Sequence, residues 1–218
     1  MNNAATQDGN FALRNLSEQE KFWQGEFGNQ YVDRNVGRPL VAANLALFSR
    51  VLARAGRIDS LMELGTNAGN NLQALRQLLP GCELFGVEIN ASACARARAL
   101  DIAQIWHGSL FDFPRNRQYD LTLGKGVLIH LDPSLLPMAY AQLYELSSRY
   151  ILIAEYYNPV PVEVSYRGNT GKLFKRDFAG EMLERYADLQ LLDYGFVYHR
   201  DPQFPADDIT WFLLEKRS

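Results

Sequence analysis

The sequence predicts an α/β fold, in which a mostly parallel β-sheet is covered by helices on both faces. Short apolar runs alternate with segments of helical periodicity along most of the chain. One apolar run leads into a loop with two glycines at 61–72, and the next, at 84–89, carries the carboxylate Glu88 near its end. Because ligands of such sheets bind at the carboxyl ends of the strands, these two runs outline a nucleoside-binding half-sheet.

The individual elements can be placed in order along the chain. Ser17 and Glu20 have the spacing of a capping box that begins a short helix, and 41–55 carries apolar residues at helical spacing. Strands are expected near 60–64, 83–88, 103–107, 119–123 and 150–155. Further helices are expected near 70–79, 91–100, 134–147 and 177–186. The last two apolar runs, 189–199 and 209–215, flank a turn-rich link and are expected to pair antiparallel at the sheet edge.

The chain is expected to form one domain, because α/β folds of about this length, 218 residues, often make a single unit. Residues 1–16 are polar and are predicted to form a flexible tail, whereas 17–218 form the folded domain. Within that domain, 17–55 is predicted to be a helical lid or cap and 56–218 the core of sheet and helices.

Composition argues against several classes of partner. The formal net charge is −3, and Lys and Arg are spread along the chain, which indicates no nucleic-acid partner. The longest apolar stretches are far shorter than the roughly 20 residues of a membrane span, and residues 1–10 lack the apolar core of a signal peptide. A cytoplasmic protein that does not bind membranes is therefore expected. Cys82 and Cys94 have no metal-ligand spacing, so no metal site and no disulfide framework are predicted.

The loop after the first strand has the pattern E-x-G-x-x-x-G, formed by Glu63, Gly65 and Gly69. Glycine at position 65 can adopt φ > 0 and lets backbone amides approach a ligand closely. Dinucleotide and triphosphate sites need G-x-G-x-x-G or G-x-x-x-x-G-K-[ST], and this loop has neither pattern. Glu63 would repel phosphate but suits an ammonium or sulfonium group. Glu88, 23 residues after Gly65, is spaced to accept both hydrogens of a ribose diol.

With these residues the chain resembles the class I S-adenosylmethionine (SAM) dependent methyltransferases, whose first motif is [DE]-x-G-x-x-x-G. The resemblance implies a Rossmann-like fold with a seven-stranded, mostly parallel sheet and an antiparallel edge hairpin, and it implies SAM as the cofactor. The segments 22–35, 155–178 and 198–211 look, more specifically, like the methyltransferases associated with pseudaminic acid biosynthesis. That likeness covers nearly the whole chain from Phe22 onward, but it assigns neither an acceptor nor a base.

The candidate cofactor-binding residues follow from their positions at the strand ends and in the lid. Gly108–Leu110 follow the third strand, where backbone amides would meet the adenine edge, and Lys125 either holds the SAM carboxylate or is a solvated lysine. Trp23 and Tyr31 would face the sulfonium and Arg34 would pair with the ligand carboxylate, unless the lid aromatics only pack a helix against the domain. The full set is Trp23, Tyr31, Arg34, Glu63, Gly65, Thr66, Asn67, Gly69, Glu88, Ile89, Gly108, Ser109, Leu110 and Lys125.

The acceptor side is expected at 155–178, a proline-containing loop that follows the fifth strand. In-line methyl transfer needs a positioned nucleophile and exclusion of water, and a hydroxyl or amino acceptor must lose a proton. The sequence does not distinguish between the candidate bases, which are His130, Glu155, Tyr166 and His199.

Other residues of this side have candidate roles in binding. Asn158 and Arg167 would orient a sugar hydroxyl or a carboxylate, and Tyr156 and Tyr157 would line the methyl channel. The alternative is that these residues only pack the loop, and that His130 only orders the turn that follows it. The predicted catalytic set is Tyr156, Asn158, Tyr166, Arg167 and His130.

Three functions are compatible with these observations. The first is SAM-dependent methylation of oxygen or nitrogen on a small sugar or amino-acid-like acceptor, by a monomer or homodimer. The second is a SAM cyclase or lyase that makes azetidine-2-carboxylate and methylthioadenosine on the same fold, because a fold does not fix which carbon of the sulfonium reacts. The third is a SAM-binding protein without catalysis. A wide cleft beside the methyl group would favour transfer, and a nearly closed one would favour cyclisation.

Overall fold

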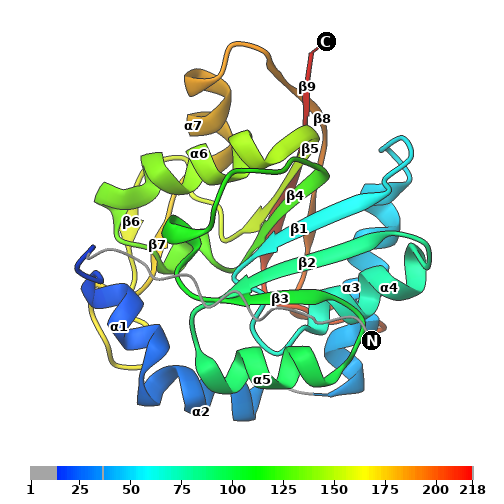
Figure 1. The fold of residues 1–218 in the computed structure, drawn as a ribbon. Coiled ribbons are helices and arrows are strands. Elements are labelled where there is room, and N and C mark those ends of the chain that lie inside the picture. Colours follow the sequence, from blue (N-terminus) through cyan, green and yellow to red (C-terminus); the bar gives the residue numbers. More distant parts are fainter. Residues whose placement is uncertain (1–13, 36, 218) are drawn as a thin grey trace.

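The protein was analysed as a computed structural model, which describes residues 14–35 and 37–217. A seven-stranded sheet forms its centre, in the order β3-β2-β1-β4-β5-β9-β8 (Figure 1). The strands are β1 (Ser60–Leu64), β2 (Glu83–Glu88), β3 (Gln104–His107), β4 (Tyr119–Lys125), β5 (Ser147–Glu155), β8 (Leu189–Val197) and β9 (Ile209–Lys216). The first five run parallel, whereas β9 pairs antiparallel with both β5 and β8. The predicted α/β fold with its antiparallel edge is confirmed.

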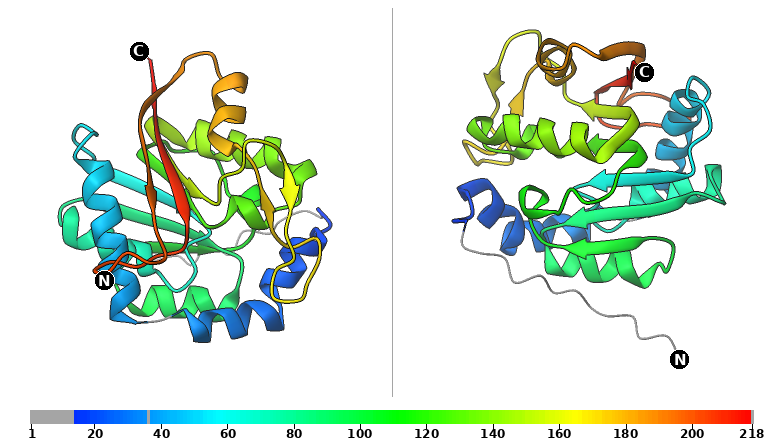
Figure 2. Two further views of the ribbon diagram at one scale, coloured as in Figure 1. Left: turned by 180° about the vertical axis from the view of Figure 1, so that it is seen from behind. Right: turned by 45° about the horizontal axis from the view of Figure 1, so that its top comes forward.

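Helices cover both faces of this sheet (Figure 2). One apolar core lies under α3 (Arg38–Leu52), α4 (Asn70–Leu78) and α5 (Ala91–Ala99), and the other lies under α6 (Leu136–Leu146) and α7 (Phe178–Arg185). Short 3-10 helices η1 (Leu110–Asp112), η2 (Leu128–His130) and η3 (Pro133–Leu135) follow β3, follow β4 and precede α6. Central strands such as β5 are buried on both faces, which is why their sequences read as continuous apolar runs.

The structure differs from the expected elements at three places. The helix predicted at 41–55 begins earlier, at Arg38, because Pro39 occupies its first turn, where its missing N–H costs no hydrogen bond. Strand β5 begins at Ser147, three residues before the predicted start. The loop predicted at 155–178 contains a small antiparallel pair, β6 (Val162–Glu163) and β7 (Phe174–Lys175).

Two short helices, α1 (Glu18–Gln24) and α2 (Glu26–Arg34), form the N-terminal part of the lid. The capping box predicted at Ser17 and Glu20 begins α1. The lid is fixed to the core where Val32 packs with Ala68 and Ala93.

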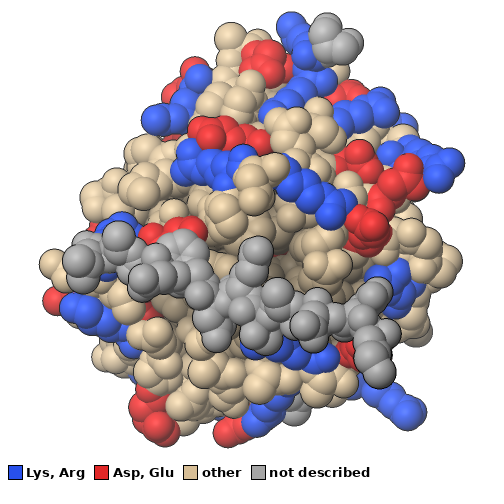
Figure 3. All heavy atoms as spheres, in the orientation of Figure 1, with Lys and Arg blue, Asp and Glu red and all other residues tan. Residues whose placement is uncertain are grey.

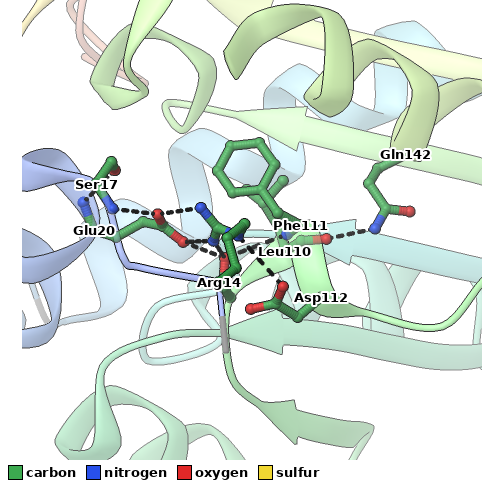
Figure 4. Close-up of polar contacts among 8 residues, drawn as sticks. Arg14, Ser17, Glu20, Leu110, Phe111, Asp112 and Gln142 are labelled. Atoms are coloured by element: carbon green, nitrogen blue, oxygen red, sulfur yellow. Dashed lines mark hydrogen bonds and ion pairs between the residues drawn. The ribbon is translucent and has the colours of Figure 1, made fainter. Parts of the chain in front are cut away.

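Most of the predicted polar tail, residues 1–13, lies outside the described residues, but Arg14 belongs to it and is anchored. Its guanidinium forms an ion pair with the buried carboxylate of Glu20 and donates a hydrogen bond of 3.1 Å to Ser109 Oγ (Figure 4). Arg14 is therefore held against α1, because a buried carboxylate requires a cationic partner.

The described residues show a mixed charge on one face, and they contain no helix that could span a membrane and no cluster that could hold a metal ion. On the face that Figure 3 shows, basic and acidic side chains lie intermixed. None of the described helices has the length and apolar character needed to cross a membrane. Within 14–35 and 37–217, no group of three or more His, Cys, Asp or Glu side chains could hold a metal ion, and Cys82 and Cys94 are buried free thiols.

Candidate functional site

A cavity of about 570 Å³ lies at the carboxyl ends of β1, β2, β4 and β5, under the lid. Its volume is in the range of small-molecule sites. Most of the residues predicted for the site line this cavity. They are Trp23, Tyr31, Gly65, Thr66, Asn67, Glu88, Ile89, Gly108, Ser109, Leu110, Lys125, His130, Tyr156, Tyr166 and Arg167. Sheet topology thus brings together residues that are more than 140 positions apart in the chain.

The glycine loop has the backbone geometry that its sequence predicts. Gly65 has φ of 75°, and a Cβ atom there would lie 2.5 Å from Val127 Cγ2, so this position accepts no side chain without a shift. The backbone amides of Gly65 and Thr66 both donate to Val87 O at 2.9 Å, which joins the loop to β2. Gly69, with φ of 83°, lies at the N-cap of α4 and does not line the cavity.

Glu88 presents a fixed carboxylate at the end of β2. Its side chain is buried, its Oε2 accepts from Asn67 N at 2.7 Å, and its Oε1 accepts from Asn90 N at 2.7 Å. Burial raises the pKa of this carboxyl, and the two backbone amides oppose that shift because they favour the ionised form. The carboxylate retains lone pairs on the cavity side, where it can accept hydrogen bonds from two neighbouring hydroxyls.

The other end of the loop rests on Glu63, which lies beneath the cavity rather than in its wall. Glu63 is fully buried, and its Oε1 accepts from Asn71 Nδ2 at 2.5 Å. Among the described residues its Oε2 has no hydrogen-bond partner. Burial raises its pKa to about 8, so this carboxyl is largely protonated at neutral pH.

The turn after β4 is held by Glu155, one of the candidate bases. Its Oε1 accepts from Val127 N at 2.9 Å and from Leu128 N at 2.8 Å, so the carboxyl caps η2. Burial raises the pKa of Glu155 to about 7. Lys125, the last residue of β4, lines the cavity. Burial lowers the pKa of its ammonium, and Glu63, Asp207 and Glu155 oppose that shift.

His130 is a buried, neutral imidazole at the cavity wall. Its Nδ1 lies 2.7 Å from Lys172 O, and because a carbonyl can only accept, Nδ1 is the protonated nitrogen and Nε2 carries the lone pair. Burial lowers the pKa of the ring to about 4. The following turn is ordered instead by Asp132, whose Oδ1 accepts from Ser134 N at 2.9 Å. The ring of His130 is therefore held by the loop at 155–178, through Lys172, and does not order the turn that follows it.

Aromatic rings close the cavity on the acceptor side. The ring centroid of Trp23 lies 4.5 Å from His130 and 5.1 Å from Tyr31, and that of His130 lies 4.9 Å from Tyr166. These rings come from the lid, from η2 and from the loop after β5, so three separate segments meet here.

Tyr166 and Arg167 reach the cavity through a tight turn. Tyr166 and Asn169 form an isolated antiparallel bridge, and the two residues between them, Arg167 and Gly168, have φ of 50° and 82°. Two central residues with φ > 0 are the pattern of a type I′ hairpin turn. The sequence did not indicate it, because arginine is uncommon at the first of these positions.

Several predicted residues lie away from the cavity. Arg34 is exposed, with its guanidinium carbon 5.6 Å from the centroid of Phe27. Asn158 Nδ2 donates to Val160 O at 2.6 Å, which makes it a bridge within its own loop. Tyr157 is 41% exposed and packs near the ring of Phe212.

The cavity also has lining residues that sequence reasoning did not select, among them Glu20, Asn44 and Asp207. Glu20 showed only its capping role in the sequence, yet its carboxylate also binds Ser109 beside η1 (Figure 4). Asp207 lies in the link between β8 and β9, and its charge helps to raise the pKa of Tyr156. No local pattern marks an acidic residue in such a link as a site residue.

Solved structures show what this chain is similar to. It superposes on the magnesium protoporphyrin IX methyltransferase of Synechocystis PCC 6803 with SAM bound, at a TM-score of 0.63 and 12% identity, over 94% of this chain and 100% of that one. The fold is that of the SAM-dependent methyltransferases. The plantazolicin methyltransferase gives a TM-score of 0.62 at 14% identity, over 92% and 94% of the two chains. A glycopeptide N-methyltransferase gives 0.59 at 12%, over 82% and 94%.

Sequence comparisons add no family to this result. No protein-family model matches the chain. No curated protein matches it in sequence either. The specific likeness to the methyltransferases associated with pseudaminic acid biosynthesis therefore stays a prediction.

Proposed function

We propose that the protein binds SAM and transfers its methyl group to a small sugar or amino-acid-like acceptor. The observation that carries this proposal is the placement of Glu88 in one cavity with the Gly65 loop and Lys125. SAM requires three kinds of group from its site. A carboxylate accepts hydrogen bonds from the ribose diol, a closely approaching backbone contacts the nucleoside, and a cation pairs with the carboxylate of the methionine part. The neighbours with SAM or its product S-adenosylhomocysteine (SAH) bound, on the same fold, support the assignment.

The residues of the nucleoside side have distinct roles in this proposal. Glu88 accepts hydrogen bonds from the ribose hydroxyls, and the backbone of Gly108–Leu110 meets the adenine edge. Lys125 pairs with the carboxylate of the methionine part. Gln142 Nε2 donates to Leu110 O at 2.7 Å, so the turn that faces the base is also held from α6 (Figure 4).

Residues of the acceptor side exclude water from the reacting groups and orient the acceptor. SAM provides a methyl group on a sulfonium, a leaving group that becomes a neutral thioether. The rings of Trp23, Tyr31 and Tyr166 exclude water and attract a positive charge through their faces. His130 Nε2 accepts a hydrogen bond from the attacking hydroxyl or amine and so directs its lone pair. Because the pKa of His130 is about 4, the ring keeps this acceptor through the neutral range.

The aromatic closure also favours a second candidate, intramolecular cyclisation or lysis of SAM. A chamber sealed by Trp23, Tyr31, Tyr166 and His130 would allow the amino group of SAM to attack its own γ-carbon without competition from water. The exposed polar rim at Arg167 and Asp207 favours methyl transfer, because a second substrate needs an opening.

Turnover of SAM separates these functions. The purified protein is incubated with SAM, with and without a panel of sugars and amino acids, and SAH and methylthioadenosine are quantified by mass spectrometry. SAH that accumulates only in the presence of an acceptor is the expected result. Methylthioadenosine formed catalytically without acceptor would overturn methyl transfer and establish cyclisation or lysis. Binding without any consumption of SAM would instead establish a non-catalytic SAM-binding protein.

A further inference from the structure

Asp207 places a carboxylate at the rim of the cavity. It lies in the segment between β8 and β9, its residue is exposed, and it lines the same cavity as Glu88. It lies close enough to Tyr156 for its charge to raise the pKa of that hydroxyl. No ion pair of Asp207 occurs among the described residues, although Lys125 lies near enough to feel its charge. Its remaining lone pairs are therefore available to a ligand.

Three tyrosines line the same cavity as this carboxylate, and the charge of Asp207 acts on two of them, Tyr31 and Tyr156. Tyr31 comes from the lid, Tyr156 from the end of β5 and Tyr166 from the hairpin turn, and all three line the cavity. Burial, and then the charge of Asp207, raises the pKa of Tyr156, so its hydroxyl stays protonated. Burial, followed by the influence of Tyr166 and Asp207, raises the pKa of Tyr31 as well.

This surrounding is selective for positive charge. The faces of tyrosine rings attract cations, and a carboxylate forms a charge-assisted hydrogen bond with an ammonium group. An anionic ligand would be repelled by Asp207, and a neutral hydroxyl would gain much less from it. Arg167 lies on the same rim, with its guanidinium 6.0 Å from the centroid of Tyr166, and it does not form an ion pair with Asp207 in the described structure.

We propose that Asp207 recognises a protonated amine of the second substrate, so that the acceptor is an amine and the methyl group is transferred to nitrogen. The inference rests on the proposed function and names its substrate class. It makes Asp207 the residue that distinguishes an amine from the corresponding alcohol.

The chemistry of such a step balances without a further reactant. The ammonium first gives one proton to the Asp207 carboxylate, which is exposed and passes it to water. The lone pair of the neutral nitrogen then forms the bond to the methyl carbon while the carbon–sulfur bond breaks. Its electron pair goes to sulfur, which leaves SAH as a neutral thioether and the product as an N-methylammonium ion.

Two known ligands test this without knowledge of the acceptor. Sinefungin carries an ammonium group where SAM carries its methyl, whereas SAH has nothing there. Dissociation constants of both are measured by titration calorimetry on the wild-type protein and on Asp207→Asn. The wild type is expected to bind sinefungin at least about tenfold more tightly than SAH, from a charge-assisted hydrogen bond. Asp207→Asn is expected to remove that preference and to bind SAH as the wild type does.

Two further variants serve as controls. Asp208→Asn removes the same charge from the neighbouring position, where the carboxylate instead accepts from His199 N at 3.0 Å. It is expected to keep the preference for sinefungin. Tyr156→Phe keeps the carboxylate of Asp207 and the aromatic ring at position 156, and it too is expected to keep the preference.

The results that differ from these expectations would overturn either the role of Asp207 or the proposed function. Equal affinities in the wild type, an unchanged preference in Asp207→Asn, or the same loss in Asp208→Asn would overturn the role of Asp207. A wild type that binds neither SAH nor sinefungin would overturn the proposed function itself. Unchanged SAH binding by Asp207→Asn shows that the variant is folded.

Discussion

The two halves of the cavity are built in different ways. In the nucleoside half, Gly65, Glu88 and Gly108 each lie at the end of a neighbouring parallel strand, and backbone hydrogen bonds hold the loops that carry them. In the acceptor half, Tyr31, His130, Tyr156, Tyr166 and Asp207 come from five segments that converge only in the folded chain. The first half depends on short-range sequence patterns and the second on long-range packing, so mutations should affect them differently.

The largest effect is expected in the nucleoside half, from Glu88→Ala. Loss of two hydrogen bonds from ribose hydroxyls to a carboxylate should weaken SAH binding about 100-fold or more. Titration calorimetry measures this. Glu83→Ala, at the exposed start of the same strand, should bind SAH normally. A loss below threefold for Glu88→Ala would mean that the nucleoside lies elsewhere.

Gly65→Ala tests the close approach of the glycine loop to Val127, in the turn after β4. A Cβ atom at φ of 75° and 2.5 Å from Val127 Cγ2 adds backbone strain and overpacking, so the free energy of unfolding should fall by about 3 kcal/mol. Gly171→Ala is the matched control, because φ is 65° there and no atom lies within 4 Å of the added carbon. It should cost only about 1 kcal/mol, for the strain alone. Urea unfolding measures both, and equal losses would show that the approach to Val127 is unimportant.

The protonation state of Glu63, which lies beneath the nucleoside half, is tested by measuring the free energy of unfolding at different pH values. Glu63 has a pKa raised to about 8 in the folded chain, so the folded state keeps its proton while the unfolded state releases it above about pH 4.5. The stabilisation present below pH 4.5 is therefore lost as the pH rises toward 8. Relative to Glu63→Gln, the wild type should lose about 2 kcal/mol of unfolding free energy between pH 6.5 and 8.

Urea unfolding of wild type and variant at both pH values checks this expectation. The exposed Glu184→Gln provides the control and should follow the wild type at each pH. A constant difference between wild type and Glu63→Gln across this range would contradict a raised pKa.

The smallest effect is expected in the acceptor half, from Trp23→Leu. Loss of one ring face beside a sulfonium should weaken SAM binding by about 2- to 30-fold and SAH binding less. Phe22→Leu is the neighbouring control, since Phe22 stacks on Phe27 at 4.1 Å and does not line the cavity. If SAM and SAH lose affinity equally in Trp23→Leu, the ring only packs the lid.

The sequence predicted the sheet, and it placed Gly65 and Glu88 at the edge where the cavity lies, because the signals for both are local. A strand followed by Gly65, or ended by Glu88, encodes its role within a few residues. The acceptor half could not be predicted in the same way. Arg167 adopts φ > 0 in a turn that usually holds asparagine or glycine, and Asp207 looks like any exposed acid of a link. Asn158 sits in the predicted loop, yet local hydrogen bonding turns its side chain to Val160 O.

The anchoring of the lid has a consequence for the order of events in a catalytic cycle. Glu20 ties α1 to Arg14 and Ser109, and Asn90 Nδ2 holds Trp23 O at 3.1 Å, so the lid is fastened over the nucleoside end. The exposed residues Arg167 and Asp207 lie on the acceptor side of the same cavity, and we expect ligands to enter and leave there. Under the proposed function, a nucleoside seated behind these residues would arrive before the second substrate and depart after the methylated product. We therefore expect an ordered kinetic sequence in which SAM binds first and SAH leaves last.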